Sequence, residues 1–170
     1  MNDSKSNRRP FWIKPLAAVA SARPVIAILK RYLPNIDRWL MSRTKGRVAL
    51  TAGLPTLLLT TMGCKSGQQR STPLLYLRYG DDWVVIGTNF GATSHPAWYI
   101  NLKTNPQATL LLKGEQVKVL ARDALQDERA DLWLWAVQLY PGYETYKSRV
   151  GDRQVPIAVF SRVNPSAARV

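Results

Sequence analysis

The chain has 170 residues, 46% of them hydrophobic, so it is large enough for one domain with a buried core. A single cysteine excludes a disulfide framework and a cysteine-rich metal site, and a single histidine excludes a zinc site built on two imidazoles. No apolar run reaches the roughly 18–20 residues of a membrane-spanning helix. The formal net charge of +13 favours an anionic partner: nucleic acid, acidic lipid or a phosphate-bearing cofactor.

Most of the excess charge lies in residues 1–48, which hold eleven Lys or Arg and two Asp. Residues 49–170 are only mildly basic. Because the charge is concentrated in one segment, nucleic-acid binding is disfavoured as the role of the whole chain. We predict a basic N-terminal extension over 1–48 and a folded domain over 49–170.

Within the extension, apolar residues recur every three or four positions, which predicts one face of a helix that Pro34 kinks or divides. These residues are Val25, Leu29, Leu33, Ile36 and Leu40. Such a helix either presses on an anionic membrane surface through residues 23–47, or packs its apolar stripe on the domain.

From Pro55 onward the pattern is one of short strands separated by turn residues. Strands are predicted over 56–61, 74–79, 83–88, 108–112, 116–121 and 156–162. Helices are predicted over 95–102 and 127–139, and a tight aromatic segment follows over 140–146. About six strands without long crossovers favour an α+β fold that is mainly β: a small barrel with flanking helices.

The turn at 63–73 combines two glycines, two cations and several hydroxyls. Glycines permit backbone angles that expose N–H groups, and Lys65 and Arg70 can pair with an anion. The residue order differs from that of a Walker A loop, and no helix follows. The turn is either a phosphate cradle or a solvated basic hairpin.

A loop of small residues over 87–94 precedes the first predicted helix. Loops and helix N-termini of this kind offer backbone donors to an anion or to the polar edge of a ring. His95 is either an acid–base group or a residue that caps the helix start. Trp98 and Asn101, three residues apart, either flank a planar ligand or only pack.

Tyr140, Tyr143 and Tyr146 recur at every third residue of the aromatic segment. If this segment is helical, the three rings lie on one side of it. They then either wall a pocket for a planar substrate and supply phenolic protons, or cover an edge of the core.

Three motifs, in this order, resemble the deazaflavin-dependent nitroreductase family over about residues 57–161. They are TTMGCKSGQQRSTPL, GATSHPAWYINLKTNP and YPGYETY, starting at 60, 91 and 140. The resemblance implies a split β-barrel that binds coenzyme F-420, a deazaflavin, with FMN the less favoured cofactor and no metal. It implies hydride transfer to a quinone, a nitro compound or another electrophilic acceptor. The alternative is a non-catalytic carrier of a deazaflavin, a flavin or a fatty acid.

The resemblance also implies a role for each residue that matches a family motif. The cofactor phosphate would be held by Lys65 and Arg70, with backbone donors from Ser66, Gly67 and Gln68. Leu75 and Tyr76 would lie close to the ring system. The wall along the deazaflavin and its tail would consist of Thr88, Asn89, Phe90, Gly91, Ala92, Pro96, Ala97, Trp98, Tyr99 and Asn101. The catalytic residues framing the substrate pocket would be Tyr140, Tyr143 and Tyr146.

Two places in the chain depart from the nitroimidazole-reducing members of that family. Those members carry Ser-Lys-Gly-Gly where this chain has Thr88 to Gly91, and some carry Tyr in place of Leu75. Both differences bear on nitroimidazole activation more than on cofactor binding. With the basic extension, the resemblance leads us to expect a cytoplasmic enzyme at the inner face of the cell membrane, which meets a lipid quinone there. A homodimer is compatible with this pattern.

Overall fold

The computed structural model describes residues 43–44 and 53–163. The amphipathic helices predicted within 1–48 therefore lie outside the described residues, apart from positions 43 and 44. No helix of the described part is long and apolar enough to cross a membrane. The elements of 53–163 are β1 (Thr56–Met62), β2 (Gln69–Leu75), β3 (Leu77–Tyr79), β4 (Asp82–Ile86), the 3-10 turn η2 (Asn89–Gly91), α3 (Ala97–Thr104), β5 (Gln107–Leu112), β6 (Glu115–Asp123), α4 (Arg129–Leu139), α5 (Gly142–Lys147) and β7 (Ile157–Arg162).

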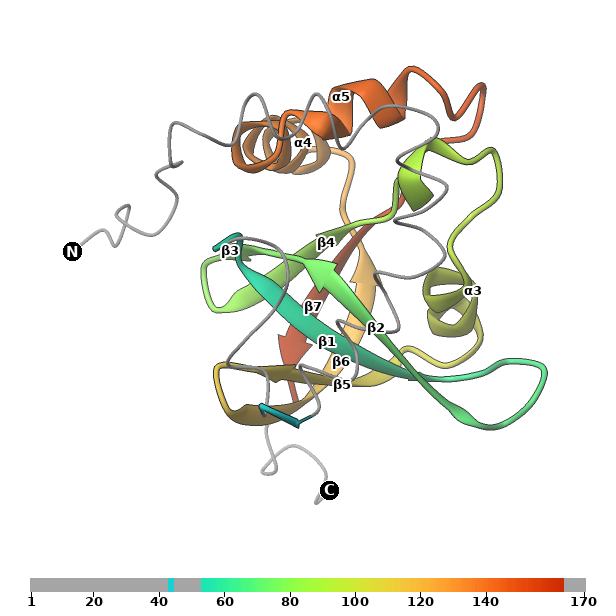
Figure 1. Cartoon of the computed structure of the whole chain (residues 1–170), viewed down its shortest axis with the longest axis vertical. Helices are drawn as coiled ribbons and strands as arrows, with labels where there is room; N and C mark the ends of the chain where they lie inside the picture. Colours follow the sequence, from blue (N-terminus) through green and yellow to red (C-terminus); the bar gives the residue numbers. More distant parts are fainter. Residues whose placement is uncertain (1–42, 45–52, 164–170) are drawn as a thin grey trace.

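The strands form one antiparallel sheet in the order β2-β1-β5-β6-β7-β4-β3. Its two outer strands, β2 and β3, follow each other in the chain and are separated only by Tyr76. The sheet therefore curls until its two edges meet at this residue (Figure 1). The Tyr76 backbone N–H donates to the Pro55 carbonyl at 3.0 Å, just before β1 begins. The predicted mainly β barrel with attached helices is confirmed.

Side chains alternate between the two faces of each strand and so supply two cores. Trp83 and Val85 of β4 point into the barrel, where Phe160 of β7 is fully buried. Val84 and Ile86 point outward and pack with the inner faces of α4 and α5. The helices lie together over this outer face, which places α5 beside one end of the barrel (Figure 1).

Most predicted elements are confirmed with shifts of one or two residues at their ends, and three places differ more. The strand predicted over 74–79 is interrupted at Tyr76, where the chain passes from one sheet edge to the other, and β2 extends back to Gln69. The helix predicted from His95 begins at Ala97, because Pro96 keeps an extended backbone as its N-cap. The aromatic segment forms the short helix α5, with Tyr140 at the end of α4.

Candidate cofactor and acceptor site

Four of the predicted functional segments lie in sequence along one side of the molecule. In Figure 1 the β1–β2 turn, α3 and the loop that holds η2 follow one another on the right, and α5 lies across the top. The turn contacts α3, and the η2 loop contacts α5. The Cys64 N–H in the turn donates to Asn101 Oδ1 of α3 at 3.1 Å. Phe90 of η2 meets the ring of Tyr146 of α5 edge-on at 6.0 Å between centroids.

The β1–β2 turn is ordered by its own backbone. The Gly63 N–H donates to the Gln68 carbonyl at 2.9 Å, and the Gly67 N–H donates to the Gly63 carbonyl at 2.8 Å. Gly67 has φ +63°, which a side chain would strain. Ser66 is exposed, and its hydroxyl accepts a hydrogen bond from the Gln68 N–H at 3.3 Å. This geometry fixes the predicted phosphate-binding residues on a tight turn.

Lys65 and Arg70 project from this turn as exposed cations. The guanidinium of Arg70 donates to Gln68 Oε1 at 3.1 Å, which limits its orientation. Within residues 53–163 neither cation takes part in an ion pair. Both charges therefore remain available to an anionic group, and guanidinium geometry suits the two oxygens of a phosphate.

Asn101 connects the turn to α3. Its Nδ2 donates to the Thr61 hydroxyl at 3.0 Å, while its Oδ1 accepts from the Cys64 N–H. The side chain is only 6% exposed. Asn101, which the resemblance assigns to the cofactor wall, thus makes protein contacts that hold the turn against the helix.

The loop around η2 carries three consecutive residues in the left-handed region: Asn89 at φ +52°, Phe90 at +56° and Gly91 at +79°. This conformation is costly for Asn89 and above all for the bulky Phe90. Inside the loop, the Gly91 N–H donates to the Thr88 carbonyl at 3.0 Å, and the Ala92 N–H donates to the Asn89 carbonyl at 3.1 Å. These hydrogen bonds help to hold Asn89 and Phe90 at backbone angles that non-glycine residues disfavour.

Arg153 holds this loop, and the sequence reading missed it. Its guanidinium donates to the carbonyls of Gly87, Thr88 and Ala92 at 3.2, 2.9 and 3.0 Å. Burial of the guanidinium lowers the pKa of Arg153 below its ordinary value. The pairing of β4 with β7 brings the residue beside the loop, and no sequence motif marks that pairing.

The three tyrosines come together as predicted. The hydroxyls of Tyr140 and Tyr146 lie 3.3 Å apart, and the rings of Tyr140 and Tyr143 are perpendicular at 5.4 Å between centroids. Tyr143 is 7% exposed, and this burial raises the pKa of its phenol. A Cβ at Gly142 would overlap the Tyr140 ring, so this glycine permits the packing.

Half-buried apolar side chains surround the tyrosines. Leu75 and Phe90 pack against the same core that contains Tyr143 and Tyr146, and Tyr140 is itself half-buried. Phe90 belongs to the η2 loop and contacts the Tyr146 ring, so this predicted cofactor segment meets the predicted acceptor residues. This arrangement suits a planar, largely apolar molecule held near phenolic hydroxyls.

Several other residues that the resemblance assigns to cofactor binding are buried. Tyr76 and Trp98 belong to the inner core of the barrel, and burial raises the pKa of the Tyr76 phenol. Thr88 and Pro96 are also buried, whereas Ala97 at the start of α3 is exposed. His95 is exposed, and its ring lies 5.3 Å from that of Tyr99.

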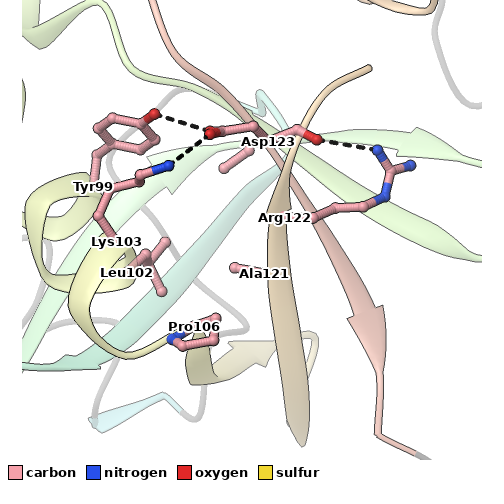
Figure 2. Close-up of a pocket in the computed structure, with 8 residues that line it drawn as sticks. Tyr99, Leu102, Lys103, Pro106, Ala121, Arg122 and Asp123 are labelled. Carbon is pink, nitrogen blue, oxygen red and sulfur yellow. Dashed lines mark hydrogen bonds and ion pairs between the residues drawn. The ribbon is translucent and has the colours of Figure 1, made fainter.

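A separate pocket of about 210 Å³ opens between α3 and β6 (Figure 2). Asp123 dominates its polar rim: it accepts a hydrogen bond from the Tyr99 hydroxyl at 2.9 Å and pairs with the Lys103 ammonium at 3.1 Å. Arg122 donates to the Asp123 carbonyl at 3.2 Å. Of the predicted wall, only Tyr99 lines this pocket, so it lies beside the proposed site and does not coincide with it. Within residues 43–44 and 53–163, no three His, Cys, Asp or Glu residues gather as a metal site would require.

Comparison with known proteins covers nearly the whole described region. A family model described as F420H(2)-dependent quinone reductase matches residues 35–162. A curated F420H(2)-dependent quinone reductase of Mycobacterium tuberculosis is 32% identical over 124 residues, which cover 70% of this chain and 83% of the relative.

Solved structures give the same result. An F420-H2 dependent reductase superposes with a TM-score of 0.58 at 31% identity, covering 63% of this chain and 94% of that one. A second structure, a domain-swapped dimer, superposes with a TM-score of 0.59 at 27% identity and covers 73% and 98% of the two chains.

Proposed function

The chain belongs to the F420H(2)-dependent quinone reductase family, and we propose that it transfers a hydride from reduced coenzyme F-420 to a quinone. The observation that carries this proposal is the extent of the family match. It spans the β1–β2 turn, the η2 loop, α3 and the tyrosine cluster, which the structure places along one side. The same enzyme class accounts for the absence of a catalytic triad from the sequence motifs, because a bound cofactor carries the hydride chemistry.

The residues present fit an anionic deazaflavin. Lys65 and Arg70 are exposed cations without carboxylate partners in the described part of the chain. They would hold the phosphate of the cofactor, and the Gly67 region of the turn would approach it with its backbone. The η2 loop and the first turn of α3 would border the ring and the tail. We also propose that Ser66 and Gln68 supply backbone donors to the phosphate, and that Asn89 and Ala92 line the deazaflavin and its tail.

The protein contributes position, shielding and a proton. When bound, the cofactor supplies the hydride, and a quinone needs one further proton to become a hydroquinone. The hydroxyls of Tyr140 and Tyr146 are close enough to exchange a hydrogen bond, so Tyr140 can give up its proton while Tyr146 stabilises the resulting oxygen. The half-buried Leu75 and Phe90 would keep water from the reacting face.

The decisive test is turnover. Purified protein is mixed with reduced F-420 and a water-soluble naphthoquinone, and the return of the oxidised deazaflavin absorbance is followed. The proposal expects oxidation only when protein and quinone are both present. Binding of F-420 without turnover on any quinone would instead support a non-catalytic split-barrel carrier.

Reduction of nitro compounds is a narrower proposal on the same site. Phe90 occupies a position where nitroimidazole-reducing members of the resembled family have glycine, and its ring contacts Tyr146. We therefore expect quinones to be reduced with a higher kcat/KM than a nitroimidazole. The reverse ranking in the same absorbance assay would contradict this.

Two further proposals concern location and assembly. A cytoplasmic enzyme held at the inner membrane face by its basic N-terminal segment would meet lipid quinones directly, and the eleven Lys and Arg of residues 1–48 support this. A homodimer is supported by the relative that forms a domain-swapped dimer. Light scattering on the eluting protein should give twice the 19.1 kDa chain mass, and a mass of one chain would reject the dimer.

A further inference from the structure

Arg153 joins the two ends of the η2 loop. On the side where the loop begins, its guanidinium donates to the carbonyls of Gly87 and Thr88 at 3.2 and 2.9 Å. On the side where the loop ends, it donates to the Ala92 carbonyl at 3.0 Å and lies 3.4 Å from Nδ1 of His95. One side chain thus spans the segment that borders the proposed cofactor site.

The segment between these contacts needs such support. Asn89 and Phe90 are non-glycine residues in the left-handed region, and Gly91 continues that conformation. The loop's own hydrogen bonds close one tight turn and join the Asn89 side-chain amide to the Ser94 carbonyl at 3.1 Å, but none of them reaches Gly87, where the loop begins. Without an external contact, relaxation of Asn89 and Phe90 toward ordinary backbone angles would reshape the loop.

The guanidinium of Arg153 is bound by uncharged backbone groups rather than by carboxylates of the described residues. Its partners in the described residues are neutral carbonyls and one imidazole, and it forms no ion pair with a carboxylate there. Its Nε is buried and lacks a hydrogen-bond partner. Because no carboxylate of the described residues forms an ion pair with this cation, it leaves a positive field beneath the loop, which favours an anion on the loop's outer side.

We propose that Arg153 is a positioning residue that holds the η2 loop in the shape required to bind the anionic cofactor. The proposal rests on the proposed function, since it concerns the same site. It requires an arginine in particular: the planar fork reaches carbonyls at both ends of the loop, whereas a lysine ammonium is a single point of contact. Through the Phe90–Tyr146 contact, the loop's position also sets one wall of the acceptor pocket.

The first test needs no cofactor. Amide hydrogen exchange is measured on the full chain for wild type, Arg153→Lys and Arg153→Gln. Arg129→Lys is the matched control, because Arg129 also donates to a backbone carbonyl, that of Val155 at 2.8 Å, without contacting the loop. Exchange at Gly91 and Ala92 should rise about tenfold in both Arg153 variants and stay at the wild-type rate in the control. An unchanged rate in the Arg153 variants would overturn the proposal.

The second test measures cofactor affinity, which would not change if Arg153 had only a structural role. The Kd for oxidised F-420 should rise about tenfold in Arg153→Lys, a change equivalent to about 1.4 kcal/mol, and further in Arg153→Gln, which also loses the charge. The kcat at saturating reduced F-420 should change less than KM, because Arg153 does not touch the reacting atoms.

The outcomes separate the two proposals. Faster exchange with an unchanged Kd would make Arg153 a purely structural residue and overturn the inference while leaving the proposed function intact. If wild-type protein binds no F-420, the proposed function fails and the cofactor role of Arg153 fails with it. An equal rise of Kd in Arg129→Lys would also overturn the inference, because the effect would then be general destabilisation.

Discussion

At the scale of single residues, the site separates exposed groups that can contact a ligand from buried groups that shape it. Lys65 and Arg70 are exposed on an ordered turn, whereas Tyr143 and Asn101 are almost fully buried. Ligand affinity should therefore respond to the first pair, and folding stability to the second. Two predictions follow from this contrast.

Lys65→Ala and Arg70→Ala should each weaken binding of oxidised F-420 by about 1.5–3 kcal/mol, the range for a charge-assisted hydrogen bond to phosphate. Fluorescence titration measures the Kd. Lys118→Ala removes an equally exposed lysine from the middle of β6 and serves as the control for net charge. If neither variant differs from Lys118→Ala, the turn does not bind the cofactor.

Tyr143 should make the protein sensitive to alkali. Burial raises the pKa of its phenol, so the folded chain keeps this group neutral where the unfolded chain, with a pKa near 10, ionises it. The stability that Tyr143 contributes is complete below pH 10 and is lost as the pH rises further. The loss approaches about 1.4 kcal/mol for each pH unit above 10.

The measurement is urea unfolding at pH 8 and pH 10.5 for wild type and Tyr143→Phe. The drop in unfolding free energy between the two pH values should be smaller in the variant, because phenylalanine has no proton to lose. Burial also raises the pKa values of Tyr76 and Tyr99, but these groups are present in both proteins and cancel. Equal drops in the two proteins would contradict the buried position of the Tyr143 phenol.

At the scale of elements, the site depends on how loops are fastened to the helices beside them. The β1–β2 turn is attached to α3 by Asn101, and the η2 loop meets α5 through Phe90 and Tyr146. Each attachment is a side-chain contact between segments far apart in the chain. Small changes at these points should therefore shift a whole loop.

Asn101→Ala should lower the free energy of unfolding by about 1–3 kcal/mol, because the Thr61 hydroxyl and the Cys64 N–H both lose their partner. It should also weaken F-420 binding, since Lys65 lies next to Cys64. Asn105→Ala at the end of the same helix loses only one local bond, to the Gln107 N–H, and should change both quantities less. Similar effects of the two variants would mean that Asn101 does not hold the turn.

Some of these elements could be predicted from the sequence and others could not. Strands β1 and β5 were predictable, because each contains three consecutive leucines, Leu57–Leu59 and Leu110–Leu112. The first half of β2 was not, since Gln69 to Thr72 are polar residues on a sheet edge. The interruption at Tyr76 arises from barrel closure, which no local pattern encodes.

The candidate site divides in the same way. The cationic turn and the tyrosine triplet carry their signal in residue type and spacing, so both could be found. Asn89 and Phe90 adopt left-handed backbone angles although neither is a glycine, so the sequence gives no sign of this conformation. Arg153 lies 61 positions beyond Ala92, its partner at 3.0 Å, and only the β4–β7 pairing brings the two together.

At the scale of the whole molecule, the net charge is distributed unevenly along the chain. The residues proposed to bind the cofactor and the quinone lie in the described barrel. Most of the net charge of +13 belongs to residues 1–48. Basic residues near an anionic bilayer contribute about 1 kcal/mol each, which is the basis of the proposal that this segment attaches the enzyme reversibly to a membrane. The acceptor would then be a quinone already dissolved in that bilayer.

Full-length protein should sediment with vesicles that contain anionic lipid at low salt and should be released as salt rises, because attachment is electrostatic. Replacing Lys30, Arg31 and Arg38 together by Gln should reduce the bound fraction several-fold. A control triple replacement at Lys113, Lys118 and Lys147 removes the same charge from the barrel. Failure of the wild type to bind at low salt would end the membrane proposal and leave the enzymatic one untouched.

The most direct test of the account is titration of the purified chain with oxidised F-420 and, separately, with FMN, followed by fluorescence. The account predicts tight binding of F-420, weak binding of FMN, and loss of F-420 affinity in Arg70→Ala. A preference for FMN, or F-420 binding that survives Arg70→Ala unchanged, would contradict the proposed site at the β1–β2 turn.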